Sequence, residues 1–180
     1  MNKTFDFYFD FISPYSYLAY KKLNLINKEK KIKINFKPML LGGLHKLGGI
    51  TAPAFNKLKL KNMKIDCELV AKKNNIEFYW NSKFPINSLY LMRGYLVIND
   101  QLKKIYFDNC FDDYWKNNID LSKKENFEKI LKKTGLIKKN FFDNINDLKI
   151  KDELKKLTSD AFNKDIFGAP TFVVNNRIFW

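Results

Sequence analysis

A strand, a helix opened by Ser-Pro and a second strand follow one another at the start of the chain, and this order limits the fold more than any other feature. Between residues 5 and 11 phenylalanine fills every odd position and aspartate or tyrosine every even one, which is the period of a β-strand. Ser13 can cap the following helix at Pro14, because proline's fixed φ and missing N–H suit the first helical position. Apolar residues at 32, 34 and 36 then alternate with Lys or Asn over residues 31–37, and this second strand ends at Pro38. The opening is therefore β-α-β.

The middle of the chain, to about residue 165, predicts helices after an initial loop. Two Gly-Gly pairs and Pro53 within residues 39–53 are typical of a loop. Asn87 is placed to cap one helix, and Ser122 with Glu125 has the spacing of a capping box before another, which Gly135 would end. An earlier helix is predicted by apolar residues at helical spacing: Phe55, Leu58, Ile65 and Leu69.

The end of the chain predicts a strand and a hairpin. The segment FGAPTFVV, residues 167–174, enters a strand through Pro170, and Asn175 with Asn176 is suited to a tight turn into RIFW. A β-α-β opening, a helical middle and a proline-led strand with a hairpin make up the layout of the thioredoxin fold. We therefore predict an α/β protein with a discontinuous thioredoxin-like domain (residues 1–44 and 160–180) and an inserted all-helical domain (residues 45–159).

Composition and charge exclude several functional classes. The net charge of +14 comes from lysines scattered through nearly every segment, which is unlike a nucleic-acid-binding stripe and favours an anionic small-molecule partner. Cys67 and Cys110 are far apart and in no metal-ligand or Cys-x-x-Cys spacing, so we expect no metal site and no disulfide, and interpret both as buried thiols. Asp6 and Asp10 interrupt the first apolar run, and no later run is long enough to span a bilayer. We therefore expect a cytoplasmic protein with no membrane partner.

The first helix begins where a thioredoxin fold holds its reactive sulfur. At that point unpaired N–H groups and the helix dipole stabilise an anion. Here the dithiol motif is replaced by Ser13, Pro14, Tyr15 and Ser16, so the chain cannot exchange disulfides by itself. A serine O–H can instead donate to a thiolate that a cofactor supplies, which lowers the pKa of that thiol.

Four segments together resemble one enzyme family. Residues 7–20 (FYFDFISPYSYLAY) and 167–174 (FGAPTFVV) are specific in combination, and residues 57–71 and 84–93 are further blocks in the right order. They resemble the 2-hydroxychromene-2-carboxylate isomerases and their relatives, the kappa-class glutathione transferases. The resemblance implies glutathione as the cofactor and a small aromatic molecule as the substrate, and it allows a homodimer.

The resemblance also implies residues that bind glutathione. Ser13 corresponds to the serine that activates the glutathione sulfur; the alternative is an N-cap alone, and the two roles are compatible. Pro170 corresponds to a cis-proline, and Ala169 before it would offer its backbone N–H and C=O to the cysteinyl unit; the alternative is a trans proline that opens an edge strand. Lys59 would pair with a glutathione carboxylate, or is one of many solvated lysines.

Four further residues are candidates for contact with the substrate. Tyr15 comes directly after Ser13 and Pro14, and His45, the single histidine, lies in the glycine-rich segment where some relatives carry a substrate-facing lysine. A plain loop histidine is the alternative for His45. Trp80 is a wall of the aromatic pocket or a core residue, and Arg93 serves the substrate or a structural salt bridge.

Two departures from the family pattern bear on ligand binding. Ile50 stands where kappa-like relatives carry an asparagine, so one polar contact is expected to be absent. The family continues after its final Phe-Trp with a segment that binds the γ-glutamyl end of glutathione, whereas this sequence ends at Trp180. From this difference we expect the chain as given to bind glutathione weakly.

These features predict a glutathione-dependent isomerase that converts an aromatic hemiketal acid to its ring-opened isomer by reversible thiolate addition. The first alternative is a kappa-type glutathione transferase or peroxidase, which differs in the step after thiolate formation. The second alternative is a thioredoxin-fold binding protein that has lost its cysteines.

Overall fold

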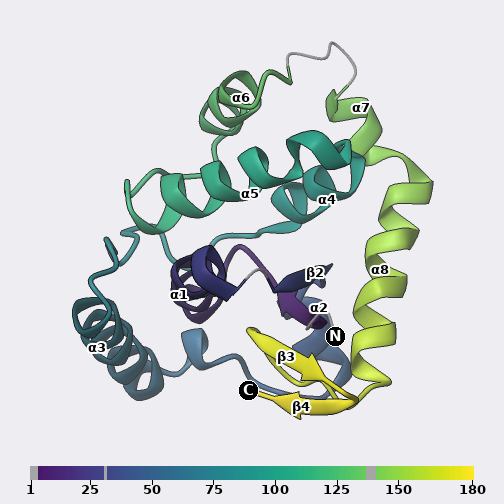
Figure 1. Ribbon diagram of the computed structural model, residues 1–180. Coiled ribbons are helices and arrows are strands. Elements are labelled where there is room, and N and C mark those ends of the chain that lie inside the picture. Colours follow the sequence, from purple (N-terminus) through teal and green to yellow (C-terminus); the bar gives the residue numbers. More distant parts are fainter. Residues whose placement is uncertain (1–3, 31, 137–140) are drawn as a thin grey trace.

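In the computed structural model, which describes residues 4–30, 32–136 and 141–180, the two ends of the chain meet in one sheet (Figure 1). The sheet has four strands in the order β2-β1-β3-β4; β1 and β2 are parallel and joined by the helix α1, while β3 pairs antiparallel with β1 and with β4. The predicted β-α-β opening and closing hairpin are confirmed, although Lys31 of the predicted second strand lies outside the described residues. Asn175 and Asn176 both have positive φ, 48° and 60°, as a type I′ turn requires. The elements are β1 (Thr4–Phe9), α1 (Pro14–Lys30), β2 (Lys33–Pro38), β3 (Thr171–Val174) and β4 (Arg177–Phe179).

Helices occupy the middle of the chain, as predicted. Figure 1 shows α8 along one side of the molecule and α3 on the opposite side, with α4 and α5 between them above the sheet. The helix α8 contacts α2, α4, α7 and β2, whereas α3 packs against α1 and the short helix η1. The elements are α2 (Leu41–Leu47), η1 (Pro53–Phe55), α3 (Lys57–Lys73), α4 (Leu89–Val97), α5 (Asp100–Trp115), α6 (Lys124–Lys133), α7 (Phe141–Asn146) and α8 (Leu148–Phe162).

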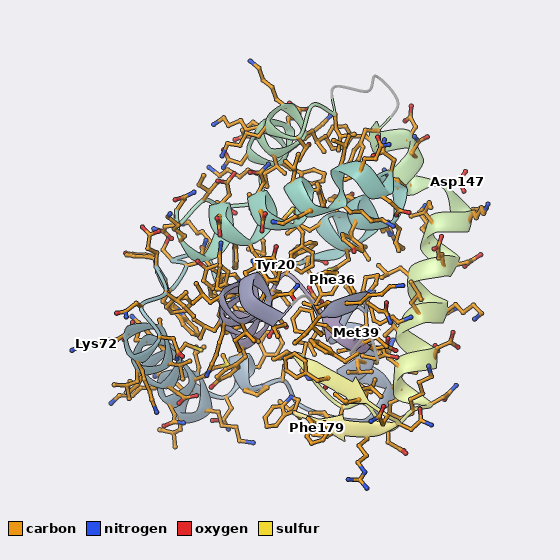
Figure 2. The ribbon with its side chains drawn as sticks, in the orientation of Figure 1. Tyr20, Phe36, Met39, Lys72, Asp147 and Phe179 are labelled. Carbon is orange, nitrogen blue, oxygen red and sulfur yellow. The ribbon has the colours of Figure 1, made fainter. Side chains whose placement is uncertain are left out.

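Both faces of the strand β1 are buried. On the phenylalanine face, Phe7 lies opposite Phe36 of β2, and the ring centroids of Phe9 and Phe107 of α5 are 4.6 Å apart. Figure 2 labels Phe36 inside this interior, where side chains of the sheet and helices meet. Tyr8 points to the other face, where it belongs to a smaller cluster of buried residues that α2 and α8 help to close: Met39, Leu44, Ala161, Ile166 and Ala169.

The predicted loop at residues 39–53 is wrong in its first half, because Leu41–Leu47 forms the helix α2. Gly42 and Gly43 lie inside this helix, and a Cβ on Gly43 would lie 3.4 Å from the methyl group of Thr158 on α8. Close packing of α2 on α8 thus outweighs the low helix propensity of glycine. The second glycine pair does end the helix, with Gly49 at a φ of 63°.

Two predicted helix caps differ in detail. Ser122 forms no capping box with Glu125; its backbone N–H and its hydroxyl both donate to the carboxylate of Asp120, because this acceptor lies two residues away in the same turn. The side chain of Asn87 accepts the N–H of the first residue of α4, close to its predicted role as a cap. Gly135, with a φ of 73°, lies just past the end of α6 as predicted.

The apolar spacing predicted the helix α3 correctly, but most of that stripe faces outward. Leu58, Ile65 and Leu69 are exposed, whereas Met63 and Cys67 are buried. The reason is that α3 has neighbours on one side, where it packs against α1 and η1. Periodicity identifies a helix but does not identify which of its faces is covered.

The predicted domain boundaries fall inside helices, since residues 44 and 45 both belong to α2 and residues 159 and 160 both belong to α8. The main cluster of buried side chains joins the first strand to α4 and α5, so the sheet and the helices above it share one core. Among the described residues, no helix is both long enough and apolar enough to cross a membrane.

Candidate active site

Ser13 lies directly before α1, where the chain leaves β1 and turns into the helix. Only 3% of the residue is exposed, and its Oγ accepts the backbone N–H of Ser16 at 3.1 Å. The same hydroxyl donates to the carbonyl of Ala169 at 2.9 Å. Ser13 is therefore an N-cap, as predicted, and it also joins the start of α1 to the segment before β3.

The segment before β3 brings the backbone of Ala169 to Ser13. The peptide bond between Ala169 and Pro170 is cis, as predicted. The hydroxyl of Thr171 donates to the carbonyl of Gly168 at 2.7 Å, which holds this bend in place. The hydroxyl of Ser13 and the segment around Pro170, which are far apart in sequence, thus meet at one point.

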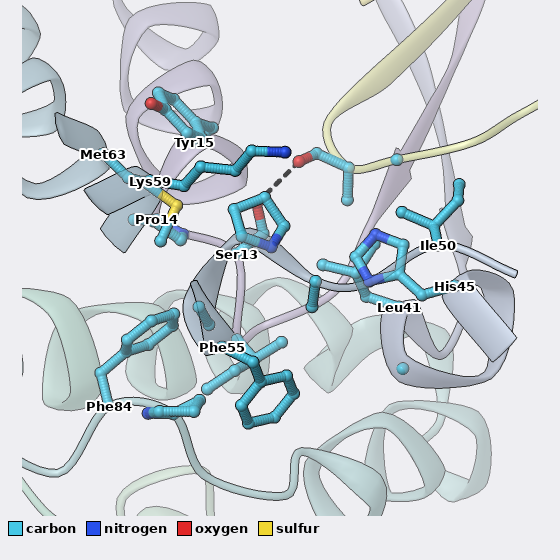
Figure 3. A pocket seen from close by; sticks show the side chains of 18 of the residues that line it. Ser13, Pro14, Tyr15, Leu41, His45, Ile50, Phe55, Lys59, Met63 and Phe84 are labelled. Carbon is cyan, nitrogen blue, oxygen red and sulfur yellow. Dashed lines mark hydrogen bonds between the residues drawn. The ribbon is translucent and has the colours of Figure 1, made fainter. Parts of the chain in front are cut away.

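A cavity of about 910 Å³ lies over Ser13 and Ala169 (Figure 3). Five parts of the chain form its wall: the start of α1, α2 with the loop after it, η1 with the start of α3, residues 84–88, and the segment before β3 together with the last residue. A concave, mainly apolar site with a few polar groups is typical of small-molecule binding. The apolar side chains of the wall include Leu41, Ile50, Phe55, Met63, Phe84 and Trp180.

Three of the predicted polar residues line this cavity: Tyr15 and Lys59 lie on one side of Ser13, and His45 lies on the other (Figure 3). The hydroxyl of Tyr15 donates to Asp66 at 2.8 Å. Burial is the main cause that raises the pKa of Tyr15, and this hydrogen bond raises it further, so the phenol stays protonated. Burial lowers the pKa of His45 from 6.5, so its imidazole is neutral at neutral pH. Lys59 contributes an ammonium group.

Trp80 and Arg93 do not line the cavity, contrary to their prediction as substrate contacts. The ring of Trp80 packs against Phe84 and Trp115, with centroids 5.0 and 5.9 Å apart, so it supports the wall from behind. Arg93 lies on α4, and its Nε is buried with no hydrogen-bond partner in the described part of the chain. Pro170 is not part of the lining either, although Ala169 before it is.

The wall also contains aromatic residues that the sequence did not single out. Phe84 precedes Pro85, and this peptide bond is cis as well. Phe55 belongs to η1, and the rings of Phe167 and Trp180 lie 5.4 Å apart near the end of the chain. The Phe-Pro pair within residues 84–93 was an available signal for Phe84. The other three come from separate segments that only the fold brings together.

Comparison with known proteins agrees with this fold. The family described as DSBA-like thioredoxin domain matches residues 4–180. A 2-hydroxychromene-2-carboxylate isomerase of Sphingobium xenophagum is 27% identical over 182 residues, with 100% of this chain and 93% of that protein covered. The glutathione S-transferase kappa 1 of Caenorhabditis elegans is 27% identical over 142 residues, with 73% of this chain and 62% of that protein covered. A solved structure of 2-hydroxychromene-2-carboxylate isomerase superposes with a TM-score of 0.88 at 22% identity, covering 98% of this chain and 88% of that one.

Proposed function

The chain belongs to the DSBA-like thioredoxin domain family, and from this premise we propose that it is a glutathione-dependent isomerase that acts on a small aromatic acid. Relatives named as isomerases and glutathione transferases support an enzyme. The observation that carries the proposal is the Ser13 hydroxyl, which is buried at the start of α1, bonded to Ala169 and in the wall of the cavity. No thiol stands at this position, because Cys67 and Cys110 are both buried elsewhere.

The hydroxyl of Ser13 has one hydrogen, and that hydrogen decides its role. It points to the carbonyl of Ala169, while Oγ accepts from Ser16. A rotation about the Cβ–Oγ bond turns the hydrogen toward an anion in the cavity and keeps the bond from Ser16. The Ala169 carbonyl is then free to accept from a ligand N–H. The same rotation thus supplies a donor for a thiolate and an acceptor for a peptide group.

The residues around Ser13 suit glutathione. Its thiol would face Ser13 and the N-terminal end of α1, its peptide backbone would lie along Ala169, and Lys59 would neutralise one carboxylate. When bound, glutathione supplies a thiolate that can add reversibly to a conjugated double bond and so permit rotation about it. The chain's contribution is to hold that sulfur ionised through one hydroxyl and the helix dipole.

The rest of the cavity suits a flat aromatic substrate. Phe55, Phe84 and Trp180 offer apolar surface, and the neutral imidazole of His45 can donate to or accept from a substrate oxygen. The phenol of Tyr15 is already bonded to Asp66, so we assign it to positioning α3 beside the cavity rather than to proton transfer. The two free thiols fit a reducing compartment, and we place the enzyme in the cytoplasm.

A kappa-type glutathione transferase is the second candidate, and the relative of that name supports it. Both candidates require the same thiolate and differ in the molecule that it attacks. Turnover of hydroxychromene carboxylates, measured beside chlorodinitrobenzene and cumene hydroperoxide, separates the isomerase from a transferase and a peroxidase.

The replacement Ser13→Ala tests the proposal. It removes one charge-assisted hydrogen bond worth roughly 1.5–3 kcal/mol, so we expect a loss of about ten- to a hundredfold in thiolate population and in turnover. The thiolate of bound glutathione is followed by its ultraviolet absorbance as the pH rises. Because the hydroxyl favours the ionised form, the sulfur of the variant should titrate at higher pH than that of the wild type.

The replacement Ser13→Asn is the matched control for the lost helix cap, which by itself costs about 1 kcal/mol of stability. Asparagine can cap α1 but places no hydroxyl against the sulfur. If both variants titrate bound glutathione at the wild-type pH and turn over normally, Ser13 is a cap alone and the proposed mechanism is wrong.

A further inference from the structure

Asp10 is a buried carboxylate directly after β1, three residues before Ser13. None of its surface is exposed. Its Oδ1 accepts the backbone N–H of Ile12 at 3.1 Å, and its Oδ2 accepts the backbone N–H of Leu41 at 2.8 Å. The side chain of Ser88 faces the same carboxylate and opposes the effect of burial on its pKa. One carboxylate thus binds two segments and faces a third, and the three are distant from one another in sequence.

All three partners line the cavity: Ile12 in the loop before α1, Leu41 at the start of α2, and Ser88 before α4. The backbone of Asp10 adds a fourth tie, because its carbonyl accepts the N–H of Ser13 at 3.0 Å. The loop that carries Ser13 and the helix that carries His45 are therefore both fixed to Asp10, which also faces the segment that carries Phe84.

Asp10 is a buried carboxylate without a salt-bridge partner among the described residues. Among the ion pairs of the described residues, none includes Asp10. Burial raises the pKa of Asp10, and its hydrogen bonds with Leu41, Ile12 and Ser88 oppose that rise. Asp113 is a useful contrast, since it is also buried but is paired with Lys133 at 2.8 Å and lies away from the cavity.

We propose that Asp10 is a positioning residue that sets the spacing between three of the five parts of the chain that form the cavity wall. It thereby fixes Ser13 relative to the residues that would face the substrate. Its two oxygens accept from two backbone N–H groups that belong to different walls, which an amide side chain cannot do, because one of its two ends is a donor. The effect on glutathione rests on the proposed function, but the effect on the cavity walls does not.

The first measurement is the amide proton chemical shift of Ile12 and Leu41 by nuclear magnetic resonance in the wild type, Asp10→Asn and Asp113→Asn. Hydrogen bonds to a carboxylate move amide protons downfield, so we expect Asp10→Asn to move at least one of the two amides upfield and Asp113→Asn to move neither. Unchanged shifts in a folded Asp10→Asn protein would overturn the proposal. This result does not depend on the identity of the ligand.

The second measurement is the affinity for glutathione by titration calorimetry, at a temperature where each variant is folded by circular dichroism. We expect Asp10→Asn to weaken binding by about tenfold or more, and Asp113→Asn to leave it within about twofold of the wild type, although both remove a buried carboxylate. Equal affinities in Asp10→Asn and Asp113→Asn would mean that Asp10 contributes to stability alone. A wild type that does not bind glutathione would refute the proposed function, and the amide shifts would then decide the role of Asp10.

The replacement Ser88→Ala keeps the test decisive if Asp10→Asn does not fold. It removes one partner of the carboxylate and leaves both backbone bonds in place. We expect the amide protons of Ile12 and Leu41 to move downfield, because the carboxylate loses a neighbouring donor and its two backbone bonds strengthen. Unchanged amide shifts in this variant would contradict a network that runs through Asp10.

Discussion

Aromatic side chains serve two different regions of this molecule. Between the sheet and α5 they are buried and pack on one another: Phe107 is 2% exposed, and its ring meets those of Phe9, Phe36 and Phe111 at centroid distances between 4.6 and 4.9 Å. Around the cavity they are open, and Phe55 is 75% exposed. The same residue type is therefore used for packing in one region and for a binding surface in the other.

The difference lies in what the rings touch. In the core each ring is surrounded by other rings, so its removal leaves a void. At the cavity a ring such as Phe55 has one face toward solvent, and its apolar surface gains contacts when a ligand covers it. Substitutions in the first region should change stability, and substitutions in the second should change binding with little effect on stability.

The largest expected effect is that of Phe107→Ala. Removing a fully buried ring should lower the free energy of unfolding by about 3–5 kcal/mol. The loss combines the transfer free energy of the ring with the cost of the void that it leaves in the core. Phe55→Ala is the matched variant from the other region, and its effect on stability should stay within about 0.5 kcal/mol. Urea denaturation of both proteins measures the contrast, and equal losses would remove the distinction between the two regions.

The next effect concerns glycine. A Cβ on Gly94 of α4 would lie 2.2 Å from the hydroxyl oxygen of Tyr106, which itself donates to the carbonyl of Leu91. Gly94→Ala should therefore destabilise the protein by about 1–3 kcal/mol through overpacking. Gly42 of α2, beside the cavity, has no side chain or other segment within 4 Å of its Cβ position, so Gly42→Ala should stabilise the protein by about 0.5–1 kcal/mol. Thermal unfolding of the pair tests both signs, and a stabilised Gly94→Ala protein would contradict the packing described for α4 and α5.

A smaller effect comes from His45, the titratable histidine of the cavity wall. Burial lowers its pKa in the folded protein below 6.5, so the unfolded chain binds more protons between these two pKa values. The cost of protonating His45 is absent above 6.5 and is fully present below the folded pKa, so stability should fall as the pH drops through that window. The difference in melting temperature between the wild type and His45→Asn, followed from about pH 8 to about pH 5, should therefore change with pH; a constant difference would place His45 in water.

The last prediction concerns the two cysteines, which both belong to the main cluster of buried side chains. Cys110 lies in the core and Cys67 lies on α3 behind the cavity wall, and both are fully buried. Burial raises the pKa of Cys67 to about 12, and that of Cys110 well above its usual value. Both thiols should react with dithionitrobenzoate more than about a hundredfold faster in denaturant than in the native protein, because reaction requires local opening. Rapid modification of Cys67 in the native state would show that α3 opens readily.

The prediction from sequence succeeded where the signal is local. Strand alternation, the Ser-Pro start of α1 and the Asn175-Asn176 turn each depend on a few adjacent residues, and the structure has all three elements. The loop assigned to residues 39–53 was wrong, because its first glycine pair is helical only through contact with Thr158 of α8. Glycine spacing alone carries no information about such a partner.

In the candidate site, too, some residues were identified from the sequence and others were placed only by the packing of the chain. The resemblance to one enzyme family pointed to Ser13, Ala169, Tyr15, His45 and Lys59, and all five line the cavity. Trp80 was misplaced, because both the cavity wall and the core behind it are aromatic and composition does not separate them. Phe84, whose ring packs against that of Trp80, lines the cavity instead.

The sequence by itself determined the order of the elements and the replacement of a reactive thiol by the hydroxyl of Ser13, because a helix start and a residue identity are local properties. The tertiary structure alone decided that Asp10 is buried, although it alternates with phenylalanines like an exposed strand residue. Burial depends on which segments pack on both faces of β1, and one hydrogen-bond partner of Asp10, Leu41, lies 31 positions further along the chain. Contacts at such separations are set by the packing of the whole chain and leave no periodic signal in either segment.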